Sequence, residues 1–148
     1  MRISHDWWKL VLIGDDYYLI RQFTSGFVQS PNYPQPYPQN AECTWSLDAG
    51  INYTTIIRIY QFDIKPTINK ACVDVVRIST GVEPGVNNLA VYCGQTSPTY
   101  IYHQTQNMYI EFYSYVTANY TGYTGFRIGY SLCKYNIIES VLNIIFAP

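Results

Sequence analysis

Apolar and polar residues alternate along several short segments of this chain, and this alternation limits the possible fold more than any other feature. In the segment QNMYIEFYSY, Met108, Ile110 and Phe112 fall on one face and the residues between them on the other. A period of two is that of a half-buried β-strand. Other strand-like segments read CTWSLDAG, CVDVVRIST, LAVYCG and GYTGFRIGYSLC, together with NYTTIIRIYQFDI, whose inner face is less clear. Turn signals separate them and helical periodicity is scarce, so the sequence predicts an all-β sandwich or barrel.

The composition agrees with one β-rich domain and argues against several classes of function. The chain has 148 residues, which suits a single domain, and 16 of them are tyrosines, which favour strands. Only 13% of the residues are charged and the net charge is −1, so nucleic acid is not an expected partner. Neither His5 nor His103 lies in a triad-like pattern, and the acidic residues are scattered. We therefore predict no catalytic residues and no enzyme activity.

The four cysteines do not form a metal-binding pattern. No two are spaced as Cys-x-x-Cys, and no histidine lies at metal-ligand spacing from any of them, which argues against a zinc site. An even number of cysteines in a small β-rich chain is typical of two disulfides formed in an oxidising compartment. Four buried thiols in a cytosolic protein are the alternative.

The first twenty residues lack the pattern of a secretory signal. Asp6, Lys9, Asp15 and Asp16 interrupt the apolar run, and only residues 10–13 are uniformly apolar. The run is also far too short to span a membrane, so direct membrane insertion is not expected. Because the cysteines favour secretion, we expect the chain to be a fragment, or the product of an imperfect gene model, without its export signal.

Five segments together resemble the CUB domain in order and spacing. They read GFVQSPNYPQPYPQNAECTWSL, CVDVVRI, VYCG, IEFYSY and GFRIGY, and they lie between Phe23 and Tyr130. The resemblance implies a jelly-roll-like sandwich of two antiparallel sheets, found in extracellular and membrane-anchored proteins, that binds partners and does not catalyse reactions. It places the CUB-like domain at residues 23–133. An N-terminal segment of uncertain structure then covers residues 1–22, and a tail or the start of a following segment covers residues 134–148.

The proline-rich stretch SPNYPQPYP begins at Ser30 and leads into the strand that opens at Cys43. Each proline fixes φ and removes a backbone donor, and the residue before a proline prefers extended conformations. We therefore expect a stiff, extended crossing at the end of the sandwich, with tyrosine rings on the core edge and their hydroxyls in water. A polyproline ligand for a partner's aromatic groove is the alternative.

The resemblance also implies a disulfide pattern. CUB domains usually have four cysteines, paired first with second and third with fourth, and Cys43, Cys72 and Cys93 match the second, third and fourth. The first should lie near residues 17–18, where the chain has tyrosines. Pairing Cys72 with Cys93 leaves Cys43 for Cys133, which is reasonable if the last strand runs beside the strand of Cys43. Alternatively, Cys43 lost its partner with a truncated N-terminus and Cys133 pairs with another domain.

Many CUB domains hold a calcium ion through one glutamate and two aspartates on loops at one end. The matching positions here carry Lys65, Asp74 and Tyr115, so two of the three acidic ligands are missing. Calcium requires six to eight oxygen ligands, several of them anionic. We therefore expect no metal and no cofactor. The three residues should still meet at one end of the sandwich, where the Lys65 ammonium group could pair with Asp74.

Two N-glycosylation sequons read NYT, at Asn52 and Asn119. Both fall in expected loops, where a glycan is tolerated. Chance occurrence of a three-residue pattern is the alternative.

The combined interpretation is an extracellular, non-catalytic module that binds a protein partner through a tyrosine-rich surface. Tyr109, Tyr113 and Tyr115 are expected on outer faces, where rigid amphipathic rings favour interfaces, although simple strand-forming surface residues would look the same. A carbohydrate-binding module, or an accessory domain of a larger secreted protease, is the alternative. Expected partners are proteins or glycans of the extracellular space and neighbouring domains of a longer parent protein.

Overall fold

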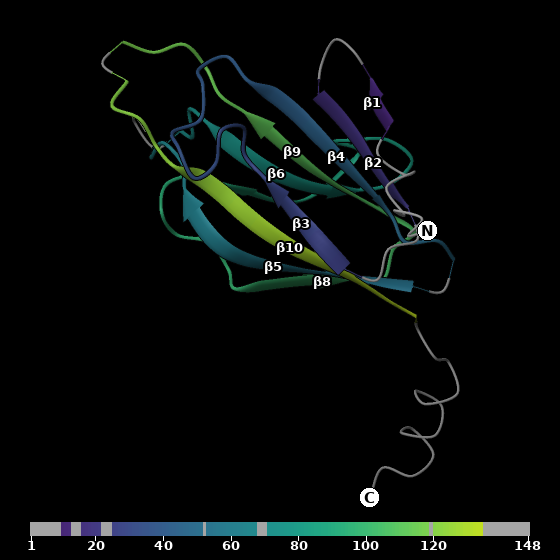
Figure 1. The fold of residues 1–148 in the computed structure, drawn as a ribbon. Coiled ribbons are helices and arrows are strands. Elements are labelled where there is room, and N and C mark those ends of the chain that lie inside the picture. Colours follow the sequence, from purple (N-terminus) through teal and green to yellow (C-terminus); the bar gives the residue numbers. More distant parts are fainter. Residues whose placement is uncertain are drawn as a thin grey trace, which may run out of the picture.

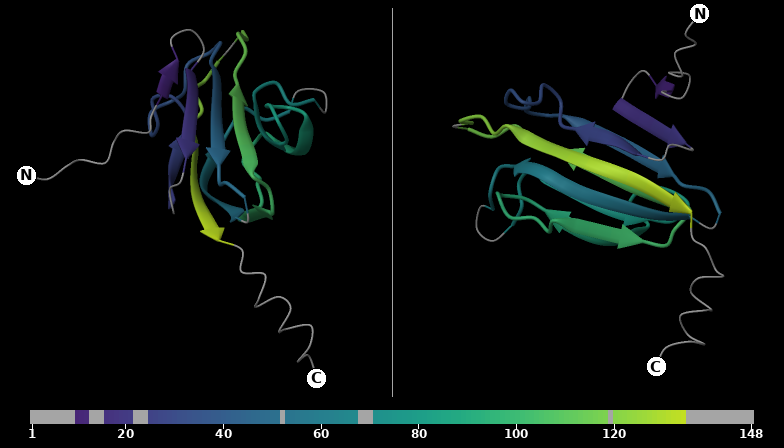
Figure 2. Two further views of the ribbon diagram at one scale, coloured as in Figure 1. Left: turned by 90° about the vertical axis from the view of Figure 1, so that its right-hand side faces the viewer. Right: turned by 60° about the horizontal axis from the view of Figure 1, so that its bottom comes forward.

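Two β-sheets pack face to face in the computed structural model, which describes residues 10–12, 16–21, 25–51, 53–67, 71–118 and 120–134 (Figure 1). The six-stranded sheet has the order β1 (Leu10–Leu12), β2 (Asp16–Arg21), β4 (Glu42–Asp48), β9 (Asn107–Tyr113), β6 (Val75–Thr80), β7 (Asn87–Tyr92). The four-stranded sheet has the order β3 (Ser25–Gln29), β10 (Gly125–Lys134), β5 (Tyr53–Asp63), β8 (Tyr100–His103). Figure 2 shows the layers from two further sides. The predicted all-β sandwich is confirmed.

The strands pair in antiparallel fashion with one exception, which involves the N-terminal part of the chain. β2 runs parallel to β4, with Asp16 beside Cys43 and Arg21 beside Asp48. A parallel pair needs a crossover connection, and β3 in the opposite sheet forms part of it. The backbone pairing of the sandwich therefore extends into residues 1–22. Residues 135–148, which make up nearly all of the expected tail, lie outside the described residues.

The two inner faces meet in one hydrophobic core. The predicted inner face of Met108, Ile110 and Phe112 is buried, and so are the apolar residues that alternate in the same way along β4 and β10: Cys43, Trp45, Leu47, Phe126, Ile128, Tyr130 and Leu132. Phe126 of β10 packs edge-on against Trp45 of β4 at a centroid distance of 5.7 Å and against Phe112 of β9 at 5.4 Å. Edge-on aromatic pairs add about 0.5–1.5 kcal/mol each beyond the burial of their area. These rings therefore fix how the sheets face one another.

A β-bulge in β5 explains why the inner face of this strand was unclear in the sequence. Ile59 and Phe62 are buried, whereas Tyr60 and Gln61 between them are both exposed. The register with β10 shifts at this point, so that one extra residue of β5 is accommodated. A bulge of this kind interrupts the alternation of faces, and here it leaves two successive exposed residues, Tyr60 and Gln61, between two buried ones.

The proline-rich stretch is not the extended crossing that the sequence predicted. Residues 31–35 form turns, and Asn32 and Asn40 adopt positive φ, which asparagine tolerates better than most residues. The turns bring Tyr37 inward, so that only 1% of its surface is exposed and its ring packs on Phe112 at 5.0 Å. The expectation of a hydroxyl in water is therefore wrong for Tyr37.

Gly125→Ala should destabilise the domain by about 3 kcal/mol or more, because backbone strain and a clash add together. Gly125 has a φ of 87°, and a Cβ there would lie 1.8 Å from Ser30 Oγ. That Oγ is buried and accepts a hydrogen bond from Phe126 N. Gly50→Ala is the matched control, since Gly50 has a φ of 81° with no atom within 4 Å of such a Cβ. Urea unfolding of both variants measures the difference, and equal losses would contradict the steric argument.

Candidate functional site

The three residues at the expected calcium positions meet at one end of the sandwich. Lys65 follows β5, Asp74 precedes β6 and Tyr115 follows β9. Tyr37, from the proline-rich loop, joins them. Its hydroxyl donates a hydrogen bond to Asp74 Oδ2 at 2.8 Å and accepts one from the Lys65 backbone N at 3.0 Å. We call these four residues, together with Thr117, the Tyr37 cluster.

Asp74 is stabilised in this cluster by neutral donors. The residue is 1% exposed, and its Oδ1 accepts a hydrogen bond from Tyr115 N at 2.9 Å while Oδ2 accepts the one from Tyr37. A buried carboxylate without such donors would be strongly unfavourable. Hydrogen bonds to an ionised acceptor are about twice as strong as those between neutral groups. Both carboxylate oxygens are thus engaged by the protein itself.

The expected pairing of Lys65 with Asp74 is wrong. Lys65 is buried as a residue, and its ammonium group donates to Thr117 Oγ1. Among the described residues, an ion pair joins Arg77 to Glu111 at 3.6 Å, and none joins Lys65 to Asp74. Asp74 instead accepts its hydrogen bonds from the Tyr37 hydroxyl and the Tyr115 backbone N.

Tyr37 and Thr117 are the members of the cluster that the sequence did not predict, and Tyr37 makes two of the cluster's hydrogen bonds. Burial, with a further contribution from the Asp74 carboxylate, raises the pKa of Tyr37 well above its ordinary value. The hydroxyl therefore keeps its proton and remains a donor. The backbone is held as well, because Tyr37 N donates to Tyr123 O at 3.1 Å and Tyr120 donates its hydroxyl to Tyr37 O. The only sequence signal was its place before a proline in the loop that precedes Cys43.

Tyr37→Phe should lower the free energy of unfolding by about 2–4 kcal/mol, because it leaves a buried carboxylate oxygen and the Lys65 N–H without their partner. Tyr115→Phe is the control at the same site, since Tyr115 contributes its backbone N and its ring is exposed. That variant should stay within about 0.5 kcal/mol of the wild type. Chemical denaturation at neutral pH measures both.

The same variant gives a second readout at alkaline pH. An unfolded tyrosine ionises near pH 10, whereas folded Tyr37 keeps its proton to higher pH. The unfolded state then binds fewer protons, so the contribution of Tyr37 to stability is complete below about pH 10 and decreases as the pH rises above it. Wild-type stability should therefore fall more steeply above about pH 10 than that of Tyr37→Phe. Parallel slopes would show that Tyr37 ionises normally.

One of the two expected disulfides is present. Cys72 and Cys93 are bonded, with an S–S distance of 2.03 Å and a Cα–Cα distance of 5.8 Å. The bond ties the segment before β6 to the end of β7. It lies near the Tyr37 cluster in sequence, two residues from Asp74, and so also restrains the position of that carboxylate.

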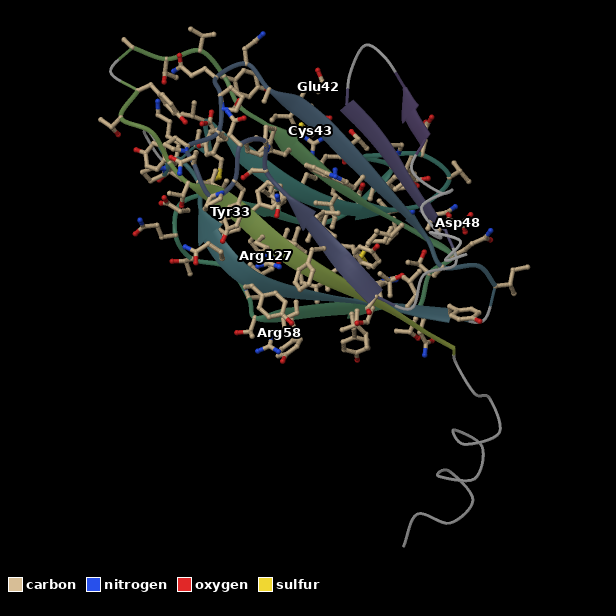
Figure 3. The ribbon with its side chains drawn as sticks, in the orientation of Figure 1. Tyr33, Glu42, Cys43, Asp48, Arg58 and Arg127 are labelled. Carbon is tan, nitrogen blue, oxygen red and sulfur yellow. A yellow bond between two sulfur atoms is a disulfide. The ribbon has the colours of Figure 1, made fainter. Side chains whose placement is uncertain are left out.

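The expected pairing of Cys43 with Cys133 is wrong. Cys43 lies in β4 of the six-stranded sheet, whereas Cys133 lies in β10, whose neighbours are β3 and β5 (Figure 3 labels Cys43). Cys43 is opposite Phe112, which packs on Phe126. From Phe126 to Cys133, β10 rises by about 3.3 Å per residue. The two cysteines are therefore on the order of 20 Å apart, far beyond the roughly 7 Å that a disulfide can bridge.

The place of the missing first cysteine can be seen in the register of β2. Asp16 is directly beside Cys43 in the parallel pair, and Tyr17 is the next residue along. This is one or two residues from the position that the resemblance implied. The position that the resemblance assigned to the first cysteine therefore lies beside the start of β4.

Only one of the three tyrosines expected on outer faces is exposed. Tyr109 is 4% exposed and donates its hydroxyl to Val82 O at 3.2 Å, because residues 81–86 turn back over this face. Tyr113 is half-buried and donates to Glu111 Oε1 at 2.9 Å; burial and this hydrogen bond raise the pKa of Tyr113 to about 12. Of the three predicted residues, Tyr115 alone is exposed.

Several expected site features cannot be located. Asn52, Asn119 and His5 lie outside the described residues, so both glycosylation sites stay predictions. His103 lies in β8. Within the described ranges, no group of three or more histidine, cysteine, aspartate or glutamate side chains could hold a metal ion. In the same part of the chain, no helix has the length and apolarity needed to cross a membrane.

Comparison with known proteins identifies the family. The family model described as "CUB domain" matches residues 19–130. The chain belongs to the CUB domain family. Cubilin of Rattus norvegicus is 30% identical over 127 residues, which is 85% of this chain but 3% of cubilin. Tolloid-like protein 2 of Mus musculus is 30% identical over 100 residues, covering 67% of this chain and 10% of that protein. The chain thus spans a small part of these relatives.

Solved structures of CUB domains share the fold. The CUB1-EGF-CUB2 domains of rat MASP-1 align with a TM-score of 0.69 and 21% identity, over 83% of this chain and 45% of that one. The MASP-1 CUB2 domain bound to Ca2+ aligns with a TM-score of 0.63 and 28% identity, over 76% of this chain and 96% of that one. The second structure bears on the Tyr37 cluster, because it is a calcium-bound member of the family.

Proposed function

We propose that this chain is a non-catalytic, extracellular CUB module that binds a protein partner and does so without calcium. CUB domains are extracellular protein-interaction modules of larger proteins and are generally non-catalytic. Because the chain covers only a small part of cubilin and of Tolloid-like protein 2, the proposal includes neighbouring domains in a longer parent protein.

The Tyr37 cluster is the observation that carries the calcium-independent part of this proposal. Calcium requires six to eight oxygen ligands, several of them anionic. The cluster offers one carboxylate, Asp74, and both of its oxygens already accept hydrogen bonds from Tyr37 and Tyr115 N. The ammonium group of Lys65 donates to Thr117 in the same cluster, where it would repel a divalent cation.

Millimolar calcium should leave the Tm of this domain unchanged, because a ligand that does not bind the native state cannot shift its stability. Thermal unfolding with calcium and with EDTA measures this. The MASP-1 CUB2 domain, solved with Ca2+ bound, is the positive control. A calcium-dependent rise of several degrees that Asp74→Asn abolishes would overturn the assignment of the cluster.

The partner surface is proposed to be the outer face of the four-stranded sheet. Three exposed tyrosines gather there, Tyr60 on β5 and Tyr100 and Tyr102 on β8, together with exposed Phe27 on β3. Aromatic rings are rigid and lose little entropy on binding, which is why they dominate protein interfaces. They also stack on apolar sugar faces, so a carbohydrate partner is the competing proposal.

A binding comparison separates these functions. The immobilised domain is incubated with extracellular fluid, with and without EDTA, and the same domain is applied to a glycan array. The proposal expects one or more proteins that bind saturably, are displaced by soluble domain, and bind equally in EDTA. Glycan binding without such a protein would support the carbohydrate function instead. If the captured partner protein no longer binds the domain in EDTA, that result would contradict calcium independence.

A further inference from the structure

A continuous row of aromatic rings and guanidinium groups crosses the outer face of the four-stranded sheet. The Arg127 guanidinium carbon lies 4.2 Å from the Phe27 ring centroid, and the Phe27 and Tyr60 centroids are 5.5 Å apart. Beyond them, Arg58 lies 4.6 Å from the Tyr60 centroid and 5.4 Å from that of Tyr100. We call these five residues the arginine–aromatic row. Its members come from all four strands, and Figure 3 labels Arg58 and Arg127.

Two backbone features build this row. The bulge in β5 keeps both Tyr60 and Gln61 on the outer side of the strand. Gly129 of β10 then lies beneath the rings: a Cβ at this position would be 2.7 Å from Tyr60 Cε2 and 3.4 Å from Phe27 Cε1. Glycine inside a strand has no side chain to pack, and here its backbone is covered by the two rings. The ring pair therefore needs glycine at position 129.

The outer face of the four-stranded sheet carries the exposed cationic side chains among the described ones. Four of the nine lysine and arginine side chains are described: Arg58, Lys65, Arg77 and Arg127. Lys65 is buried and Arg77 is paired with Glu111. Arg58 and Arg127 are both exposed, and in the described part of the chain they contact rings and no carboxylate. A guanidinium group over a ring still has its N–H donors available for a bidentate bond to an anion.

We propose that the arginine–aromatic row binds an acidic segment of a protein partner. Carboxylates of the segment pair with Arg58 and Arg127, and an apolar side chain between them packs on the Phe27 and Tyr60 rings. The inference rests on the proposed protein-binding function and specifies its surface and the chemistry of its partner. Charge-assisted, bidentate bonds from arginine give such a contact both strength and direction.

A protein segment fits the row better than the other candidates do. A sulfated glycan is a polyanion and needs many cations along its length, whereas this face has two among the described residues. Arginine mixed with aromatic rings is the composition of protein interfaces. A second copy of the chain, docked face to face, would bring the arginines of both rows into one interface with no described carboxylate to neutralise them.

The test is a selection from a random-peptide phage library on the folded domain, followed by affinity measurements with the selected peptides in synthetic form. The variants are Arg58→Gln with Arg127→Gln, the same pair changed to Lys, Tyr60→Ser and Gly129→Ala. Tyr115→Ser is the matched control for Tyr60→Ser, because the two residues are similarly exposed, at 55% and 52%. Circular dichroism and Tm verify that each variant is folded.

The proposal expects selected peptides rich in Asp and Glu with apolar residues between them. The glutamine pair should weaken binding by about tenfold or more, and the lysine pair by less, since lysine keeps the charge but not the planar fork. Tyr60→Ser and Gly129→Ala should also weaken binding, the latter by displacing the Tyr60 ring, and Tyr115→Ser should not. Added salt should weaken the wild-type complex.

Other outcomes overturn the proposal in distinguishable ways. Peptides without acidic residues, or peptides that bind the glutamine pair as well as the wild type, would refute this surface while leaving a protein-binding function intact. Retention on heparin that the glutamine pair abolishes, without selected peptides, would assign the row to a sulfated glycan. Self-association that the glutamine pair alters would assign it to a second copy of the chain. The last two results would refute an acidic protein partner.

Discussion

The contact of Phe126 with the aromatic residues of the opposite sheet is the interaction on which the rest of the structure depends. It brings the inner faces of β10 and β9 into contact. The Phe126 ring packs on the Phe112 ring, and the Phe112 ring packs in turn on the Tyr37 ring. Once this order is set, the Tyr37 hydroxyl lies at the end of the core, within reach of Asp74. The alternate residues of β10 must then point away from the core, which places Arg127 in solvent. Core packing thus positions both the Tyr37 cluster and the arginine–aromatic row.

The Tyr37 cluster shows how neutral donors of the protein stabilise a buried carboxylate. Removing Asp74 from water would be unfavourable if its oxygens had no donors. A hydroxyl and a backbone N–H supply them, and neither brings a charge that would itself need compensation. A tyrosine hydroxyl keeps its proton throughout the physiological range, and burial raises the pKa of Tyr37 further, so the donor is retained at alkaline pH as well. These hydrogen bonds connect the loops at this end of the sandwich.

Local alternation in the sequence was enough to predict the inner faces of most strands, because a period of two reports burial directly. Three features needed tertiary information. The order of strands across the sheets is not a local property, so Cys43 and Cys133 could not be separated from sequence. Whether a tyrosine hydroxyl is wet or buried depends on the turn that carries it, as with Tyr37. Tyr109 alternates as a surface residue would, and residues 81–86 cover it.

β10 contributes both to the core and to the arginine–aromatic row, because its two faces carry different residues. Phe126 and Ile128 pack in the core, while Arg127 and Gly129 belong to the outer face. Residues in the core are constrained by close packing, since a change in volume of even one methylene group affects the stability there. The exposed arginines and rings contribute little to that packing, so their identity can change with small effects on folding. The outer face of the four-stranded sheet therefore tolerates substitution better than the core does, provided that the bulge in β5 and the glycine at position 129 are kept.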